Sequence, residues 1–583
     1  MTGRGRVAVF GAGPGGLSVA LELAERGFEV DLYERHEREV GGKARSYNIA
    51  GTANGDRAGL PGEVGPHLIF GFYESMPDTL RRIPARDGRT VLDHFVTLPR
   101  GVVGWRGHAL SASSDVRVDL RSMITGGPKH FNAAPELVRV LSNPKNVALA
   151  YRLVRMLVSG SKRQWSKLEH IGTDDYFKKS KLSADGKILL NCATSGGFGN
   201  SERLNARVTR QVMVGFLRSV IGDTDLPWGL MADGPMNEVC WNPWADHLRG
   251  LGVRIHLGRR VTDLTYRHGR IVGATVVDAT SAASVVEADY YVLSTPPERT
   301  AELLNPQLVA ADPRLDLIRG IEPTWLSGFG LYLRRPVPRF PDAFLAVDQP
   351  WAIAGIRQTG FWNRDFADRY GDGEVVDYIS FDIPDWHIPG PLSGKSASEL
   401  TPEEVVREGL WQIRASLPEG DDILPDSAIH SWHVAENIHW ECGQPPAVND
   451  EPLFVNTAGL RDDQPDASTA IPNLFLAAAY VRTDMGMGAD FMESAIEAGR
   501  RATNGVLAAA GVRGEDVHIP EFAEPAWLTP LTTADDILFG LRRRITKGKV
   551  VHALRRGRAQ RGQDVASSHA PDRQSETSLR IAV

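Results

Sequence analysis

The sequence predicts an α/β fold in which one parallel sheet is assembled from segments far apart in the chain. Two similar units predict it: residues 7–34 follow the pattern strand, glycine-rich loop, helix and strand, and residues 473–502 again follow strand, loop and helix. Between these units lie a block with helical periodicity and a block with strand-like runs. The sequence therefore predicts a Rossmann-like domain with an interleaved α+β domain.

Composition narrows the class of protein. The chain has 583 residues, which is long for one domain, and its net charge of -6, 42% apolar and 24% charged residues are ordinary for a soluble globular protein. Cys192, Cys240 and Cys442 are odd in number and widely spaced, which predicts a reducing compartment and no disulfide framework. The N-terminus leaves no room for a signal peptide, and no run of about 18 apolar residues occurs. We expect a cytoplasmic protein, with attachment to the inner membrane surface left open.

The first unit, "RVAVFGAGPGGLSVALELAERGFEVDLYER", has the spacing of a dinucleotide-binding turn. Gly11 permits the tight turn, Gly13 lets the backbone approach a pyrophosphate, and Gly16 allows close packing of helix on strand. The helix N-terminus offers free N–H groups and the positive end of its dipole to the phosphates. Glu34, at the end of the second strand, can accept hydrogen bonds from ribose hydroxyls. The unit therefore predicts binding of the adenosine diphosphate part of FAD or NAD.

The segment after Glu34, "RHEREVGGKARSYNIAG", contains Gly41, Gly42, Lys43 and Arg45. Here the sequence resembles the flavin amine oxidase and carotenoid desaturase superfamily, in which a paired-glycine motif wraps the flavin side of FAD. The stretch "VGPHLIFGFYESMPDTLRRI" is similar to the phytoene and zeta-carotene desaturase branch, at Gly65, His67, Phe70, Gly71 and Tyr73. The resemblance implies FAD rather than NAD, in a GR2-type flavoprotein fold.

The resemblance continues in three later segments. Residues 231–264 look like the helix and strand that contact the FAD adenine, with Val261 at the adenine-facing position. The strand that ends at Thr295 resembles another motif of the family. The closing unit is similar to the last flavin motif, beside the ribityl chain and isoalloxazine ring, and its helix begins at Met492. Flavin motifs at the start, middle and end of the chain imply an FAD domain interrupted by substrate-domain insertions.

One position departs from the family pattern. The family usually has Gly-Asp at residues 478–479, where the aspartate reaches the ribityl or pyrophosphate region, and this chain has Ala479 instead. An alanine cannot make that hydrogen bond, although Asp484 or Asp490 in the neighbouring loop could compensate. We expect noncovalent FAD binding with reduced affinity.

The remaining chain is divided by these motifs. A helix is expected over 147–158 after a break at Pro144, and basic amphipathic segments at 147–165 and 537–545 suit an anionic lipid interface or a face packed on the protein. The expected segments are 1–74, 230–311 and 450–515 for the FAD-binding domain, 75–229 and 312–449 for the substrate domain, 516–561 for a basic amphipathic C-terminal segment, and 562–583 for a disordered tail.

The resemblance implies an FAD-dependent oxidoreductase that removes hydrogen from a lipophilic isoprenoid or polyene by hydride transfer to flavin. Alternatives are a flavin amine oxidase or another oxidation of a secondary metabolite, a hydroxysqualene dehydroxylase-like triterpenoid enzyme, and a non-catalytic flavin-fold protein. A catalytic lysine and an aromatic cage would favour an amine oxidase, and neither can be placed from the sequence. The electron acceptor is left open.

Four polar residues are candidates for an acid or base near the flavin: His67, Tyr73, Asp484 and Glu493. Each could equally make a structural hydrogen bond or a cofactor contact. No nucleophile elbow, zincin motif or P-loop occurs, so no metal is expected, and the basic residues have too few interleaved aromatics for a nucleic-acid surface. Four tryptophans could line an apolar tunnel or belong to the core: Trp362, Trp386, Trp411 and Trp440.

Overall fold

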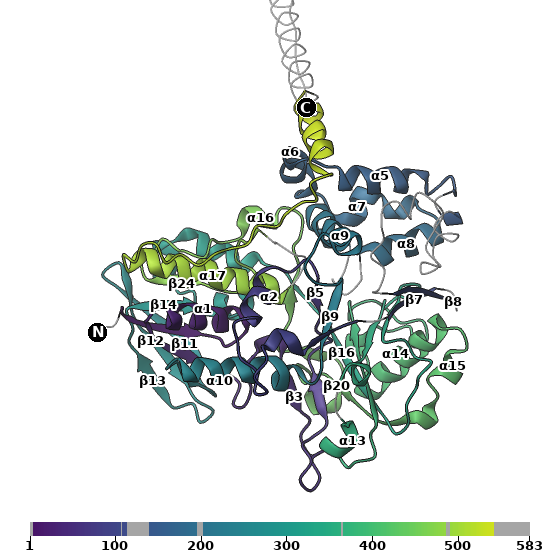
Figure 1. The fold of residues 1–583 in the computed structure, drawn as a ribbon, viewed down its shortest axis with the longest axis horizontal. Helices are drawn as coiled ribbons and strands as arrows, with labels where there is room; N and C mark the ends of the chain where they lie inside the picture. The colour runs from purple at the N-terminus through teal and green to yellow at the C-terminus, as the bar shows by residue number, and fades with distance from the viewer. Residues whose placement is uncertain are drawn as a thin grey trace, which may run out of the picture.

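The structure of the protein is a computed structural model that describes residues 4–98, 100–105, 108–113, 139–140, 142–194, 202–362, 365–484 and 490–541. A five-stranded parallel sheet lies at the centre of the first domain, because segments from both halves of the chain pair side by side (Figure 1). From one edge to the other its strands are β10 (Arg254–His256), β2 (Glu29–Tyr33), β1 (Arg6–Phe10), β14 (Tyr290–Leu293) and β24 (Leu474–Leu476).

Helices that follow the strands cover this sheet, so its strands are almost continuously apolar. The helix after β1 packs against the helix of the closing unit and against a helix from the middle of the chain. These helices are α1 (Pro14–Glu25), α17 (Met492–Ala509) and α10 (Asn242–Gly250). An antiparallel meander of β11 (Arg260–Arg267), β12 (Arg270–Val277) and β13 (Ala283–Val286) joins β10 to β14, with α11 (Pro297–Leu303) and α12 (Pro306–Ala311) beyond.

Glycines bring α1 and α17 together at backbone distance. A methyl group on Gly499 would lie 2.6 Å from the Gly15 carbonyl oxygen, and one on Gly15 would lie 1.9 Å from the Ala477 carbonyl oxygen. No larger residue fits at either position without moving a helix. The closing unit of the chain therefore packs directly on the first dinucleotide turn.

The closing strand is shorter than the apolar run predicts. β24 ends at Leu476, although the run continues to Tyr480. Ala477 still donates its N–H to the Leu293 carbonyl, and the chain then turns, with the Ala478 carbonyl accepting from the N–H of Val481. The small residues after Leu476 thus form the turn that leads toward α17.

A seven-stranded sheet forms the second domain, and Figure 1 shows α14 (Pro402–Ser416) lying across it. Its apolar face packs with α14 through residues such as Phe329, Leu331 and Phe381. Alternation along the strands gives the opposite face glycine, tyrosine and polar residues. The strand order is β20 (Ile429–Val434), β16 (Ser327–Leu333), β19 (Asp377–Ile383), β18 (Ala354–Arg357), β17 (Ala343–Ala346), β7 (Arg100–Trp105) and β8 (His108–Ser113).

A helical region covers one end of the molecule (Figure 1). Its helices are α5 (Val147–Leu157), α6 (Ser161–Arg163), α7 (Thr173–Phe177), α8 (Ala184–Thr194) and α9 (Ala206–Ile221). α5 begins three residues after Pro144 and ends one residue before the predicted boundary. Residues 529–541 form a further helix beside α6, while the rest of the basic segment and the 562–583 tail lie outside the described residues. None of the described helices has the length and apolarity needed to cross a bilayer.

Short elements connect these regions. The short strands are β3 (Ser46–Asn48), β4 (Pro61–Glu63), β5 (Ile69–Phe70), β6 (Phe95–Thr97), β9 (Gly229–Ala232), β15 (Pro323–Thr324), β21 (Ile438–Trp440), β22 (Ala447–Asn449) and β23 (Leu453–Phe454). The short helices are α2 (Ser75–Leu80), α13 (Phe366–Arg369), α15 (Gly420–Ile423) and α16 (Leu460–Asp463). β3 and β4 pair with each other and lie between the paired-glycine motif and the seven-stranded sheet.

Candidate functional site

The turn between β1 and α1 is shaped by three glycines with different surroundings. Gly11 has a φ of +103°, and a methyl group there would lie 2.6 Å from the Ser294 carbonyl oxygen. A methyl group on Gly16 would lie 1.9 Å from the Gly11 carbonyl oxygen, so Gly16 is required for packing. At Gly13 the nearest atom would be the Gly42 Cα, at 3.8 Å. Space is therefore left above Gly13, at the N-terminus of α1, where no side chain caps the helix.

Glu34 is held in place by backbone groups. One carboxylate oxygen accepts from the Ala12 N–H at 2.7 Å, and the other accepts from the His36 N–H at 2.9 Å. The side chain is buried at the end of β2, next to the first turn. Because each carboxylate oxygen can accept more than one hydrogen bond, Glu34 keeps the capacity to accept further donors at this turn.

The paired-glycine motif folds back onto this turn. Gly41 donates its N–H to the Ala12 carbonyl at 2.8 Å, and both Gly41 and Gly42 have positive φ, at +111° and +57°. A methyl group on Gly41 would lie 2.6 Å from the Trp241 indole, and one on Gly42 would lie 3.0 Å from the Gly13 Cα. The two glycine motifs thus form one side-chain-free cradle.

Lys43 ties the motif to the last part of the chain. Its ammonium group lies 2.8 Å from the Asp490 carboxylate and 3.5 Å from Glu298, and it donates to the Pro452 carbonyl. Burial lowers the pKa of Lys43, but the charges of Asp490 and Glu298 outweigh this and raise it overall. Lys43 is therefore a permanent positive charge beside the cradle.

Arg45 is the centre of a buried ionic network. It is 2% exposed and donates to Glu451 at 2.7 Å and to Glu436 at 2.6 Å. Arg35 and His36 also contact Glu451. Burial raises the pKa of Glu451, but the His36 hydrogen bond and the charges of Arg45 and Arg35 outweigh this and hold it below its usual range. This network fixes the segment that leads from β2 to β3.

The remaining predicted cofactor positions lie in the meander, in the turns after β14 and β24, and at the start of α17. Val261 lies opposite Val276 in the meander, next to a β-bulge, and Thr295 Oγ1 lies 2.8 Å from Thr300 Oγ1 in the turn after β14. Ala479 is buried in the turn after β24. Met492 begins α17, whose N-terminus no side chain caps.

The comparisons with known proteins agree with this geometry. The profile of the family described as flavin containing amine oxidoreductase matches residues 14–507. The chain belongs to this family. As a flavin oxidoreductase it uses FAD, and two observations fit that cofactor: the open cradle at Gly13 and the buried Ser494 hydroxyl near the start of α17, which has no hydrogen-bond partner.

Relatives of this flavin oxidoreductase extend over most of its length. Zeta-carotene desaturase of Synechocystis sp. is 24% identical over 534 residues, which cover 86% of this chain and 97% of that protein. Carotenoid phi-ring synthase of Streptomyces griseus is 24% identical over 556 residues, covering 91% and 93%. The solved structure of cyclohexylamine oxidase from Brevibacterium oxydans matches with a TM-score of 0.54 at 14% identity, covering 87% and 99%. That structural likeness shows the fold alone.

Two of the acid–base candidates of this flavin oxidoreductase are neutral at pH 7 because they are buried. His67 Nδ1 is buried without a partner, and burial lowers the pKa of His67 to about 4, so the ring is neutral at pH 7. Tyr73 packs edge-on against Phe70 and Phe72. Burial and the nearby Glu493 charge raise the pKa of Tyr73 well above its usual value, so it stays protonated.

The other two candidates are engaged in hydrogen bonds with the protein. The buried Glu493 carboxylate accepts the backbone N–H groups of Ser75 at 2.6 Å and Met76 at 2.8 Å, at the N-terminus of α2. Asp484 is half-exposed and pairs with Arg501 at 2.9 Å, on the far end of the loop before α17. The structure therefore gives both carboxylates structural partners.

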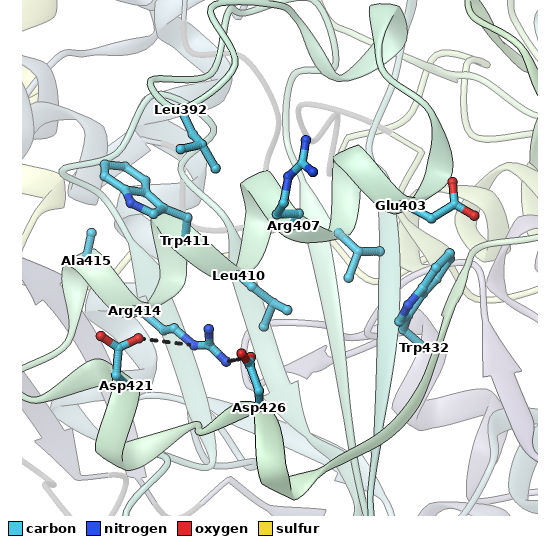
Figure 2. A pocket seen from close by; sticks show the side chains of 11 residues that line it. Leu392, Glu403, Arg407, Leu410, Trp411, Arg414, Ala415, Asp421, Asp426 and Trp432 are labelled. Atoms are coloured by element: carbon cyan, nitrogen blue, oxygen red, sulfur yellow. Dashed lines mark hydrogen bonds and ion pairs between the residues drawn. The ribbon is translucent and has the colours of Figure 1, made fainter.

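The four tryptophans do not line a common tunnel. Trp386 and Trp440 lie 6.4 Å apart in the apolar core of the seven-stranded sheet, and each donates its indole N–H to a backbone carbonyl. Trp362 belongs to a separate cluster with Tyr378. Trp411 is 42% exposed and lines a surface pocket along α14, on the side shown in Figure 2.

Sequence reasoning missed a pair of buried acids, Glu63 and Asp382, between β4 and the seven-stranded sheet. Glu63 stands two residues before the Gly65 of the desaturase-like stretch. Asp382 interrupts the apolar strand "DYISFDI", on the face that alternation assigns to polar residues. These are the signals that could have identified the pair, because an isolated acid in a buried strand needs an explanation.

Proposed function

We propose that this flavoprotein is an FAD-dependent desaturase that removes hydrogen from a lipophilic polyene or isoprenoid. The observation that carries the proposal is the likeness to carotene desaturases over nearly their whole length. The seven-stranded sheet of the substrate domain supports it. None of its seven strands contains a lysine, the residue expected of an amine oxidase. A desaturase needs no such lysine.

The residues of the chain divide the work as follows. Gly11, Gly13 and Glu34 hold the adenosine diphosphate part of FAD, and the Gly41 and Gly42 cradle lies beside them. FAD supplies hydride acceptance when it is bound. An aromatic cluster in the apolar core shared with β1 and α1 keeps water away and offers an apolar wall to a hydrocarbon: Phe70, Phe72, Tyr73 and Phe216.

The test is anaerobic reduction of the purified holoprotein. Its flavin spectrum is recorded while isoprenoids, polyenes and amines are added in turn, with a Gly13→Ala variant as the control without cofactor. Bleaching by an isoprenoid or polyene and not by amines supports the proposal. Bleaching by amines alone overturns it, and a colourless protein that cannot be reconstituted indicates a non-catalytic flavin-fold protein.

We also propose that the helical region attaches the protein to a membrane surface. Val147, Tyr151 and Val154 are 59%, 65% and 61% exposed and lie on one stripe of α5. Ile537, Leu538 and Leu541 form an exposed apolar stripe on the C-terminal helix at the same end of the molecule (Figure 1). A lipophilic substrate would be delivered from such a surface.

Two basic residues of this region have a different role from the one expected. Arg155 and Arg163 both pair with Asp535, at 3.3 Å and 2.8 Å, and Arg163 lies 4.4 Å from the centre of the Phe539 ring. They therefore join α5 and α6 to the C-terminal helix instead of facing solvent. Attachment is then mainly apolar, and it should depend weakly on salt.

Flotation of the full-length protein with neutral and anionic liposomes tests this attachment. A Val147→Ser/Tyr151→Ser/Val154→Ser variant should float less with both lipid compositions, whereas a variant truncated after residue 541 reports on the basic tail alone. Equal flotation of the triple-serine variant and the wild type would overturn the role of α5. Equal recovery after truncation would count against the tail.

A further inference from the structure

Asp382 occupies an unusual position on the polar face of the seven-stranded sheet. It lies opposite Gly328 on β16 and Ala354 on β18, so neither neighbouring strand offers a polar side chain. The residue is 6% exposed, and its Oδ1 atom is buried without a hydrogen-bond partner. A buried carboxylate oxygen without a partner carries a free-energy cost of about 1–3 kcal/mol, and it therefore needs a functional or structural reason.

The carboxyl group of Asp382 lies directly against the segment that follows β4. A methyl group on Gly65 would lie 2.7 Å from Asp382 Oδ1 and 2.9 Å from Oδ2, so only glycine allows this approach. Glu63, two residues earlier, is also buried and accepts from Gln358 Nε2 at 3.1 Å. Gln358 donates to Ser380 Oγ at 2.8 Å, on the same face as Asp382. Two acids therefore share one closed environment.

The same segment continues to the cofactor cradle. His67, two residues after Gly65, has an unpartnered buried Nδ1 and a hydrogen bond with the backbone of Lys43, the residue after the paired glycines. The segment from Glu63 to His67 therefore contacts Asp382 at Gly65 and the paired-glycine motif at His67. Of all the carboxyl groups in the described part of the seven-stranded sheet, it alone combines a polar-face position with an unpartnered oxygen.

The surroundings of Asp382 and Glu63 bring the pKa of each carboxyl group close to neutral pH. Burial raises the pKa of Asp382 to about 8, and burial together with the Asp382 charge raises the pKa of Glu63 to about 8. In the described part of the chain no cation lowers these pKa values, whereas a backbone hydrogen bond from Met236 lowers that of Glu63. The titratable groups on the packed elements are Tyr47 on β3, His67 after β4, Tyr332 on β16, Tyr378 on β19 and His433 on β20.

We propose that Asp382 is the catalytic base of this flavoprotein. The inference rests on the proposed desaturase function and names a residue for it. In forming a C=C bond, bound FAD would accept hydride from one substrate C–H bond, and the Asp382 carboxylate would take the proton of the neighbouring C–H bond. The electron pair of the second C–H bond becomes the new π bond. Glu63 is the buried neighbour whose own pKa the Asp382 charge raises, and it takes no proton from the substrate.

Asp382→Asn, Glu63→Gln and the matched control Asp385→Asn test the proposal in the holoenzyme. The wild-type rate of anaerobic flavin reduction by a reactive isoprenoid should rise with pH through about 8 and then level off. Asp382→Asn should lower the rate at least a hundredfold and abolish this pH step. Glu63→Gln should keep the step near pH 8, because burial alone raises the pKa of Asp382. Asp385→Asn should behave as the wild type.

A second readout does not depend on turnover. The infrared band of a protonated carboxyl group, followed in apoprotein and holoprotein, should disappear as the pH rises through about 8 and should be reduced in Asp382→Asn. A wild-type rate and pH profile in Asp382→Asn would overturn the inference. If Asp382→Asn does not fold, Glu63→Gln decides: a step retained near pH 8 supports the inference, and loss of the step, which would make Glu63 the titrating base, overturns it. Failure of the desaturase function would appear differently, as absence of bleaching of the wild type by any isoprenoid.

Discussion

Lys43 and Asp490 form an ion pair of 2.8 Å although 447 positions separate them in the sequence. The pair joins the paired-glycine motif to the loop that leads into α17. We predict that Lys43→Met and Asp490→Leu each lower the thermal unfolding temperature, because each removes one side of a partly buried ion pair and leaves the other charge with fewer opposite charges. The double variant should lose less than the sum, with an interaction energy of about 0.5–3 kcal/mol. Additive losses in the double-mutant cycle would show that the pair does not stabilise the fold.

The three glycines of the first turn should respond differently to the same substitution. Gly13→Ala should leave the unfolding temperature of the apoprotein nearly unchanged, because the nearest atom to the new methyl group is 3.8 Å away. Gly16→Ala should destabilise the apoprotein, because its methyl group would meet a backbone oxygen at 1.9 Å. Only Gly13→Ala should fold normally and lose FAD, which calorimetric titration with FAD would measure. Normal FAD binding by Gly13→Ala would place the pyrophosphate elsewhere.

Glu493 should contribute to stability rather than to chemistry. Glu493→Ala should lower the free energy of unfolding by about 1–3 kcal/mol, because buried N–H groups at the start of α2 lose their acceptor. Burial raises the pKa of Glu493 to about 7, above the unfolded value of about 4.3, so the stability it contributes is complete below pH 4 and is lost as the pH rises to 7. Glu493→Gln should lack this fall in denaturant unfolding curves. A large loss of flavin reduction in Glu493→Gln, with stability intact, would instead indicate a catalytic role.

Ala479 gives a prediction about cofactor affinity. Ala479→Asp restores the residue usual in the family, so it should bind FAD more tightly than the wild type, by up to about 1–3 kcal/mol. Without FAD the new carboxylate is buried and unpaired, and the apoprotein should unfold at a lower temperature. The stabilisation on adding FAD should therefore be larger than in the wild type. Equal FAD affinity of the two proteins would remove the argument from Ala479, and Ala479→Asn serves as the uncharged control.

The parts of the fold that follow local rules could be predicted from the sequence. β1, α1 and β2 lie where the glycine spacing placed them, and α17 begins at Met492 as predicted. Local rules did not predict the early end of β24. The apolar run continues to Tyr480, but only residues 474–476 have a partner on β14, and strand length is set by the partner as much as by composition.

Side-chain partners could not be predicted in the same way. Glu493 was a candidate base because it begins the flavin helix, yet its carboxylate caps α2, which precedes it by more than 400 residues. Arg155 and Arg163 looked like a lipid-facing charge pattern, but both pair with Asp535. Asp382 and Glu63 are far apart in the sequence and meet only because β4 packs on the sheet. Periodicity gives the face of an element, and only the tertiary fold gives what lies opposite.

The discontinuous order of the parallel sheet bears on how the protein is made. β24 closes the edge of the sheet next to β14, and α17 reaches α1 only after it. A ribosome must therefore release more than four fifths of the chain before the first glycine turn meets its closing helix, and the inserted domains have time to fold beforehand. FAD capture is then a late event in biosynthesis, and nascent chains stalled before residue 474 should retain no flavin.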